Sequence, residues 1–306
     1  DRLLGVLLQL LALRAPRAQD LDRPHGLLRS VISGRDGAED PPREACHDHD
    51  EHHVHQRLSD SDHPPDDEHV RQGEGRSREQ EGEGDTGTFG GGENPDDDDD
   101  SGNLIYVRVE FAGIEFSPDN ELNGIALQGV GSGTVIDHVM VAFNQDDGIE
   151  FFGGTANASY VFIYGARDDS IDCTLGWTGR IDNAVVIQRG DDGDNGFEWD
   201  NWEFGFDFTP RSMPQVTNVT LVGLKDVPGV ENGSGGRLRN GTAGLITNAI
   251  WTNFGRSGLR IQTSESMGEI TNGNLNIANS IIFGNAEPYE GDDEQIIGDM
   301  LEGDAN

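Results

Sequence analysis

From residue 104 onward, short runs of β-branched and aromatic residues alternate with segments rich in Gly, Asn and Asp. Such runs predict β-strands, and a helical spacing of apolar positions is almost absent. Successive runs start 22 to 34 residues apart, and they cover residues 104–111, 135–143, 159–165, 181–188, 215–223, 245–251 and 277–283. Short strands at this period indicate a solenoid in which each repeat forms one coil.

A second strand is predicted in three of the coils, at residues 149–151, 171–173 and 197–199. Side chains alternate between the two faces of a strand, so the apolar residues of each triplet are expected to point into the core and the acidic residue outward. The inward set is Ile149, Phe151, Ile171, Cys173, Phe197 and Trp199. Two parallel strands per coil, each stacked on its copy in the next coil, predict an all-β parallel β-helix over residues 104–306.

One asparagine recurs within the long runs, at Asn183, Asn218, Asn248 and Asn279. Asparagine tolerates the left-handed backbone conformation and forms side-chain ladders between stacked chains. We therefore expect these four residues at equivalent turn positions.

Pairs of aspartates precede the short strands, at residues 146–147, 168–169 and 191–192. Stacked coils place equivalent residues about 4.8 Å apart, so three carboxylate columns are predicted. They contain Asp146, Asp168 and Asp191; Asp147, Asp169 and Asp192; and Glu150, Asp172 and Glu198. Two carboxylates at this spacing repel by roughly 3 kcal/mol at an effective dielectric near 20, which a cation or protonation would relieve.

The carboxylate columns allow three interpretations. They are solvated turn residues, a calcium site built from hard oxygen ligands, or catalytic groups. As a calcium site, the predicted ligands are Asp146, Asp147, Glu150, Asp168, Asp169, Asp172, Asp191, Asp192, Asp194 and Glu198.

Two further groups of residues are candidates for ligand binding. The later coils carry arginine where the earlier ones carry acids, since Ser-Gly-Leu-Arg-Ile at 257–261 matches Asp-Gly-Ile-Glu-Phe at 147–151. These arginines either pair with neighbouring acids or bind uronate or sulfate groups in bidentate fashion; they are Arg237, Arg239, Arg256 and Arg260. The aromatic stretch 197–208 alternates like a strand and either packs in the core or stacks on sugar rings, with Trp199 and Trp202 as the binding candidates.

Charge and composition exclude several classes of function. The chain has 57 acidic residues against 21 basic ones and a net charge of -36, which excludes nucleic acid and anionic membrane surfaces as partners. No apolar stretch reaches the length of about 18 residues that a membrane span needs. Two cysteines form no disulfide framework.

The first 88 residues contain no aromatic side chain. We therefore predict that residues 1–78 are disordered, or that they were translated in the wrong reading frame, and that the Gly- and Asp-rich residues 79–103 form a linker. Residues 3–13 have the apolar composition of a secretory signal. The histidine-rich residues 47–55 form a loose metal-binding patch at most.

The stretch 106–160, YVRVEFAGIEFSPDNELNGIALQGVGSGTVIDHVMVAFNQDDGIEFFGGTANASY, resembles a largely uncharacterised group of secreted bacterial proteins. This group, often labelled lipoproteins, belongs to the pectin-lyase-like superfamily of right-handed parallel β-helices. The resemblance covers about residues 79–306. It implies a right-handed β-helix at the cell surface, associated with the bacterial outer membrane, or in the medium. It also implies a lipid anchor in the full-length protein and a chain truncated at the C-terminus.

Catalytic motifs of that superfamily match only in part. Asp168-Asp169-Ser170 is similar to the acidic pair of polygalacturonases, but their Gly-His-Gly and Arg-Ile-Lys motifs are missing. If the chain is an enzyme, Asp168 and Asp169 act as nucleophile and acid in glycoside hydrolysis. In a lyase, calcium would acidify a uronate proton that Arg189, or alternatively Arg167, removes.

The leading prediction is a non-catalytic, calcium-stabilised surface protein that binds an extracellular polysaccharide or a cell-surface partner. The alternative is a lyase or glycoside hydrolase acting on an acidic polysaccharide. Whether the chain is an enzyme stays open at this point.

Overall fold

A computed structural model describes residues 80–82, 86–90, 95–117, 120–189, 192–225 and 233–303. The predictions for residues 1–78, including disorder, the altered frame, the signal and the histidine patch, lie outside these ranges. Asp191 also lies outside them.

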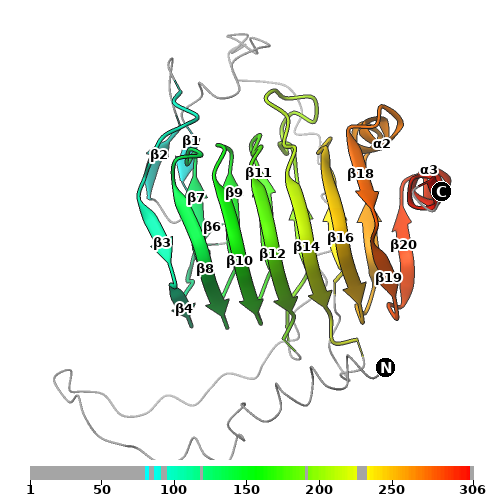
Figure 1. Cartoon of the computed structure of the whole chain (residues 1–306), viewed down its shortest axis with the longest axis horizontal. Helices are drawn as coiled ribbons and strands as arrows, with labels where there is room; N and C mark the ends of the chain where they lie inside the picture. The colour runs from blue at the N-terminus through cyan, green and yellow to red at the C-terminus, as the bar shows by residue number, and fades with distance from the viewer. Residues whose placement is uncertain are drawn as a thin grey trace, which may run out of the picture. The chain divides into compact units, whose positions relative to one another are not determined.

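Two parallel sheets form the body of the described chain (Figure 1). The larger one contains the seven predicted long runs, and all of its strands pair in parallel. Its strands are β3 (Asn103–Ile105), β4 (Arg108–Glu110), β8 (Val135–Ala142), β10 (Asn157–Tyr164), β12 (Arg180–Ile187), β14 (Gln215–Val222), β16 (Gly244–Thr252), β18 (Leu275–Ala278) and β19 (Ile281–Phe283). The parallel β-helix predicted from the repeat is thereby confirmed.

The second sheet, which we call the short-strand sheet, contains the three predicted triplets and four strands that were not predicted. Its strands are β7 (Ile125–Gln128), β9 (Ile149–Phe152), β11 (Ile171–Thr174), β13 (Phe197–Trp199), β15 (Gly236–Leu238), β17 (Ser257–Ile261) and β20 (Glu287–Gly291). All six residues predicted to point inward are 0% exposed. They join side chains of the larger sheet in one hydrophobic cluster, and burying each large apolar side chain contributes about 1.5–3 kcal/mol.

The remaining elements flank these sheets. The segment predicted as a linker holds an antiparallel pair, β1 (Gln80–Gly82) and β2 (Gly87–Phe89), and the ring of Phe89 lies 6.0 Å from that of Phe152. A second antiparallel pair is formed by β5 (Glu115–Ser117) and β6 (Asn120–Glu121). Two short helices, α2 (Ser264–Thr271) and α3 (Glu294–Gly303), lie beside the last coils. Within the described residues no helix has the length and apolarity needed to cross a membrane.

Each long strand bends at one residue in the left-handed conformation. The four predicted asparagines have φ values of 64°, 59°, 56° and 50°. The coils before them place Tyr106, His138 and Tyr160 at the same bend. The rings of Tyr106 and His138 are tilted at 4.6 Å, and those of His138 and Tyr160 are stacked at 4.4 Å. Asn218 donates to Asp182, and Asn248 donates to Asn218. The left-handed conformation predicted for the asparagines is therefore confirmed for all four, and a side-chain hydrogen bond joins two of them, Asn218 and Asn248.

Close contact between coils explains the glycine that precedes several short strands. A Cβ atom added at Gly148 would lie 2.5 Å from the carbonyl oxygen of Ser170, and one at Gly196 would lie 2.5 Å from that of Gly235. Both distances are far below van der Waals contact. Glycine at this position lets successive turns stack at the strand spacing.

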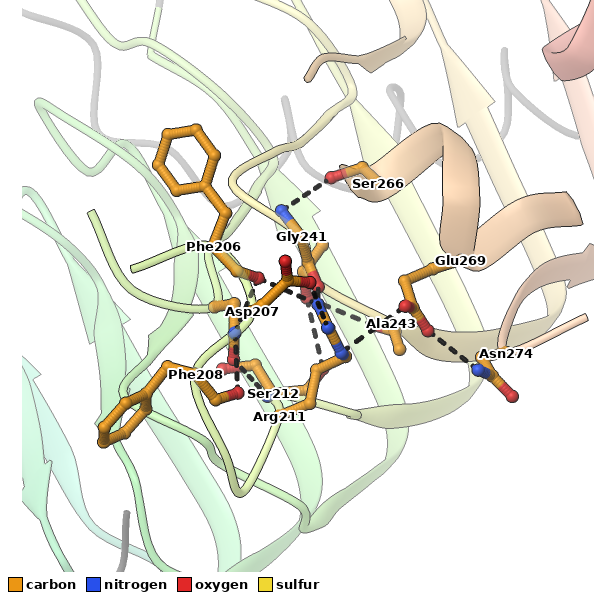
Figure 2. A network of polar contacts seen from close by, with 12 residues as sticks. Phe206, Asp207, Phe208, Arg211, Ser212, Gly241, Ala243, Ser266, Glu269 and Asn274 are labelled. Carbon is orange, nitrogen blue, oxygen red and sulfur yellow. Dashed lines mark hydrogen bonds and ion pairs between the residues drawn. The ribbon is translucent and has the colours of Figure 1, made fainter. Parts of the chain in front are cut away.

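The connection from β13 to β14, residues 200–214, is far longer than its counterparts at 153–156, 175–179 and 239–243. Arg211 holds it in place (Figure 2) by donating to the carbonyl oxygens of Phe206 and Gly241. The same guanidinium pairs with Asp207 at 2.9 Å and with Glu269 of α2 at 3.5 Å. One arginine thus joins the connections of three successive coils.

Candidate functional site

The column of outward-facing residues on the short-strand sheet has the predicted register. Asp172 lies opposite Glu150 on one side and Glu198 on the other. Beyond Glu198 the column continues with Arg237, Arg260 and Glu290. The predicted change from acidic to basic coils is therefore confirmed for this column.

The two columns at the preceding turn differ from the prediction in their third coil. In the first column, Asp194 occupies the position next to Asp168 in the following coil, since the Asp194 amide donates to the Asp168 carbonyl oxygen at 3.2 Å. Asn195 follows Asp169, whose carboxylate accepts from the Asn195 amide at 2.5 Å. Asp192 instead lies at the exposed rim and pairs with Arg167 at 2.9 Å. Placing Asp192 in the column was therefore wrong.

The reason is the length of the turn before β13. The prediction aligned aspartate pairs by identity, whereas the distance to the following strand sets the register. Asp147, Asp169 and Asn195 each lie two positions before the first residue of their short strand. Counting back from the strand would have found Asn195 in the sequence.

The column of Asp147, Asp169 and Asn195 also binds the backbone. The Asp169 amide donates to the Asp147 carboxylate at 2.9 Å, and the Ser234 amide donates to the Asn195 side chain at 3.0 Å. Each of these side chains thus accepts a backbone hydrogen bond from the next coil. This gives the buried acids a structural role that occupies one oxygen of each, and Asp169 also forms a hydrogen bond with Glu198.

Carboxylate oxygens converge in three overlapping groups, and within each group they lie within 4.8 Å of one another. The groups are Asp146, Asp147 and Asp168; Asp147, Glu150 and Asp172; and Asp168, Asp169 and Asp194. Shared members join the groups into one continuous site, which we call the carboxylate cluster. Asp172 contributes a buried Oδ1 atom that has no hydrogen-bond partner among the described residues.

Burial and mutual repulsion raise the pKa values in the carboxylate cluster. Although the Asp168 side chain reaches solvent, desolvation by the surrounding protein, followed by the charges of Asp194 and Glu198, raises the pKa of Asp168 to about 8. Burial is also the largest cause at Asp169, where the Glu198 charge adds to it, and at Asp172. The pKa values of Asp146, Asp147 and Asp194 are raised as well, chiefly by burial. Without a cation, the folded cluster therefore holds protons near neutral pH.

Glu198 behaves differently because arginines surround it. Burial opposes its ionisation, but Arg239, a hydrogen bond with Asp169, and Arg237 lower the pKa of Glu198 below its usual value. Arg239 Nη2 lies 2.6 Å from Glu198 Oε1, and Arg237 Nη1 lies 3.4 Å from it. Glu198 thus marks the boundary between the acidic and the basic coils.

The four arginines predicted to bind a ligand all have acidic partners. Arg237 and Arg239 both contact Glu198, and Arg239 also contacts Asp200 at 2.9 Å. Arg256 and Arg260 share Glu290, at 2.5 and 3.3 Å. The simpler of the two predicted interpretations, pairing with neighbouring acids, describes all four.

The other candidates occupy different environments. Trp199 is 0% exposed and packs on Phe197 with ring centroids 5.3 Å apart, so its ring is enclosed by the core. Trp202 lies partly exposed in the 200–214 connection, because the strand ends at Trp199 and does not continue to residue 208. Arg189 lies beside Gly165 and Gly193, near the turn that carries Asp194.

The raised pKa values predict that stability depends on pH. Asp168 has a folded pKa of about 8 against an ordinary value of 3.8, so its stabilising contribution is complete below about pH 4 and is lost as pH rises toward 8. The lowered pKa of Glu198 affects stability in the opposite direction, but this effect occurs at pH values below those compared here. In EGTA, the melting temperature is therefore expected to fall by several degrees between pH 5.5 and 8.5.

Matched variants separate this effect from general titration. Asp168→Asn removes one titrating group and should flatten the profile, whereas Asp192→Asn changes an exposed acid outside the cluster and should leave it unchanged. A melting temperature that rises over this pH range would contradict the assignment.

Fold and site together define a parallel β-helix with a carboxylate cluster along one edge of its short-strand sheet. The family model of the pectate-lyase like beta helix domain matches residues 72–299. The chain belongs to this family, and it is a right-handed parallel β-helix of the pectin-lyase-like superfamily, as the resemblance implied. No curated protein and no solved structure matches the chain.

Proposed function

We propose that this protein is an extracellular β-helix that binds calcium in its carboxylate cluster and an acidic polysaccharide along the same edge, without cleaving it. The observation that carries the proposal is the convergence of carboxylate oxygens within 4.8 Å in three overlapping groups. Calcium takes six to eight oxygen ligands in flexible geometry. Magnesium demands a stricter octahedron and keeps its waters, so a site of adjacent carboxylates favours calcium.

The chemistry of the donors fits this cation. Asp147 and Asp169 each use one oxygen for a backbone amide, which fixes the other oxygen in position. Asp172 adds a buried oxygen without a hydrogen-bond partner among the described residues. Exposed Asp168 lies at the rim, where a ligand from solvent reaches a bound ion directly.

An acidic polysaccharide is the partner that such a site would recognise. The net charge of -36 repels polyanions, so a saccharide carboxylate needs a bridging cation or an arginine. Calcium bound at Asp168 would supply the bridge, since the arginines of the following coils are already paired with acids. This arrangement supports a location at the cell surface or in the medium, where calcium and polysaccharides occur together.

A second candidate function rests on Asp168 alone. With a pKa of about 8, it is protonated near neutral pH when no cation is bound and could donate a proton to a glycosidic oxygen. The Gly-His-Gly and Arg-Ile-Lys motifs that accompany such an acidic pair in polygalacturonases are missing from the sequence. We therefore rank an enzyme acting on acidic polysaccharide second.

Two assays test these functions. Gel electrophoresis through immobilised polygalacturonate or alginate measures binding. Turnover is measured by new reducing ends and by absorbance at ~232 nm, where the C4=C5 double bond conjugated with the carboxylate of a lyase product absorbs. The binding function predicts calcium-dependent retardation without turnover. Asp168→Asn should abolish the retardation, and Asp192→Asn should preserve it. Turnover that Asp168→Asn eliminates would establish the enzyme instead.

A further inference from the structure

The 200–214 connection carries aromatic rings outside the hydrophobic core. Phe204 is 78% exposed, and its ring meets that of Trp202 edge-on at 5.7 Å. Trp202 also lies 4.8 Å from Phe208. A Cβ atom at Gly205 would lie 2.9 Å from the Trp202 ring, so the glycine allows the chain to fold closely over the indole. We call Trp202, Phe204 and Phe208 the aromatic platform.

The backbone beneath the aromatic platform is held at several points. Arg211 donates to the carbonyl oxygens of Phe206 and Gly241, and Asn201 donates to those of Phe206 and Phe208, both at 3.0 Å. Figure 2 shows the rings of Phe206 and Phe208 pointing away from Arg211. An exposed phenylalanine alone needs no functional explanation. Exposed rings on a fixed backbone are a different case, because a ligand that binds them loses little free energy to ordering the protein chain.

The charges around the platform decide which ligand it suits. Glu203 and Asp207 are exposed on the same connection, and Arg211 is already paired with Asp207 and Glu269. A uronate would therefore meet carboxylates and no unpaired cation. The hydroxyl groups of an uncharged sugar would instead donate to those carboxylates, while its apolar face lies on a ring.

The size of the platform favours a sugar over a protein. A stable protein interface buries roughly 800 Å² on each partner, whereas an aromatic side chain contributes about 150–250 Å² at most. Only Phe204 is strongly exposed, and Trp202 and Phe208 are partly covered. One or two pyranose rings match an area of this kind.

We propose that the aromatic platform is a second saccharide subsite, which stacks on uncharged pyranose units and operates without calcium. It extends the proposed function because it recognises a different class of sugar at a different place. A polysaccharide that contains both acidic and neutral units would contact both sites.

Tryptophan fluorescence provides a specific test. All four tryptophans of the chain are in the described residues, and Trp177, Trp199 and Trp251 are 0% exposed. Acrylamide quenching therefore reports on Trp202. In EGTA, at least one of cellohexaose, mannohexaose and xylohexaose should protect Trp202 from quenching, and hexagalacturonate should not.

Two substitutions make the test specific. Phe204→Ala should weaken the affinity for the protecting sugar by about tenfold, the effect expected from the loss of one aromatic contact. Phe111→Ala removes a comparably exposed ring, 73% exposed and remote from this connection in sequence, and should change nothing. The proposal is overturned if none of the neutral sugars protects Trp202 from quenching, or if a sugar protects Trp202 equally well in the Phe204→Ala variant. It is also overturned if light scattering shows that the unmodified protein is a dimer and that Phe204→Ala makes it a monomer. If calcium does not raise the melting temperature, the proposed function is wrong, but the quenching result for the aromatic platform is unaffected.

Discussion

Adding millimolar calcium to metal-free protein is expected to raise its melting temperature by about 5–10 °C at pH 7.5. A ligand present at about 100 times its dissociation constant stabilises the folded state by about 2.7 kcal/mol, and each kcal/mol corresponds to about 2–4 °C in a domain of this size. The physical source is the replacement of carboxylate repulsion and bound protons by ion–carboxylate attraction. Differential scanning calorimetry with and without EGTA measures it.

The control variants for calcium come from the same turns. Asp168→Asn combined with Asp194→Asn removes two carboxylates from one group of the cluster and should raise the metal-free melting temperature while reducing the calcium response to less than half. Asp192→Asn, in the same turn but paired with Arg167, should respond like the unmodified protein. Equal melting temperatures in calcium and EGTA would contradict a cation site here.

Replacing Arg211 by Leu is expected to lower the free energy of unfolding by about 2–4 kcal/mol, since breaking a largely buried ion pair leaves its partner uncompensated. Among the described residues, the Glu269 carboxylate then retains the Asn274 contact at 2.8 Å, and two carbonyl oxygens lose a charged donor. The melting temperature should fall by roughly 5–15 °C.

Arg256→Leu is the matched control for that experiment. Arg256 is also paired with a glutamate, but its side chain is 42% exposed, and exposed pairs contribute about 1 kcal/mol or less. Adding Glu269→Leu to Arg211→Leu should restore part of the loss, because no unpaired charge then remains. If the two single arginine variants melt alike, Arg211 does not hold the three connections together.

The repeating parts of the fold were predictable from sequence. Strand alternation at Ile149, Ile171 and Phe197 indicated which side chains enter the core, and stacking indicated which acids form a column. Both follow from local geometry that repeats in every coil. The short strands β15 and β17 lack the aspartate pair on which the strand prediction relied, although residues 257–261 of β17 match residues 147–151 in sequence.

The irregular parts were harder to predict for a physical reason. Asp192 and Asn195 differ in role because the turn before β13 is longer than its counterparts, which an alignment by residue identity misses and a count back from the strand recovers. The pairing of Arg211 with Glu269 joins residues 58 positions apart, through a connection and a helix that belong to no repeat. The strand predicted through residue 208 ends at Trp199 because Asn201 and Arg211 capture the backbone of the following residues.

The parallel register has an evolutionary consequence. Ile149 lies opposite Ile171, and Ile171 opposite Phe197, so every rung presents the next with an equivalent surface. After a tandem duplication or deletion of one whole rung, the core side chains of the rungs on either side would still pack on equivalent side chains. Natural variation in the length of this molecule is thus expected in increments of a rung.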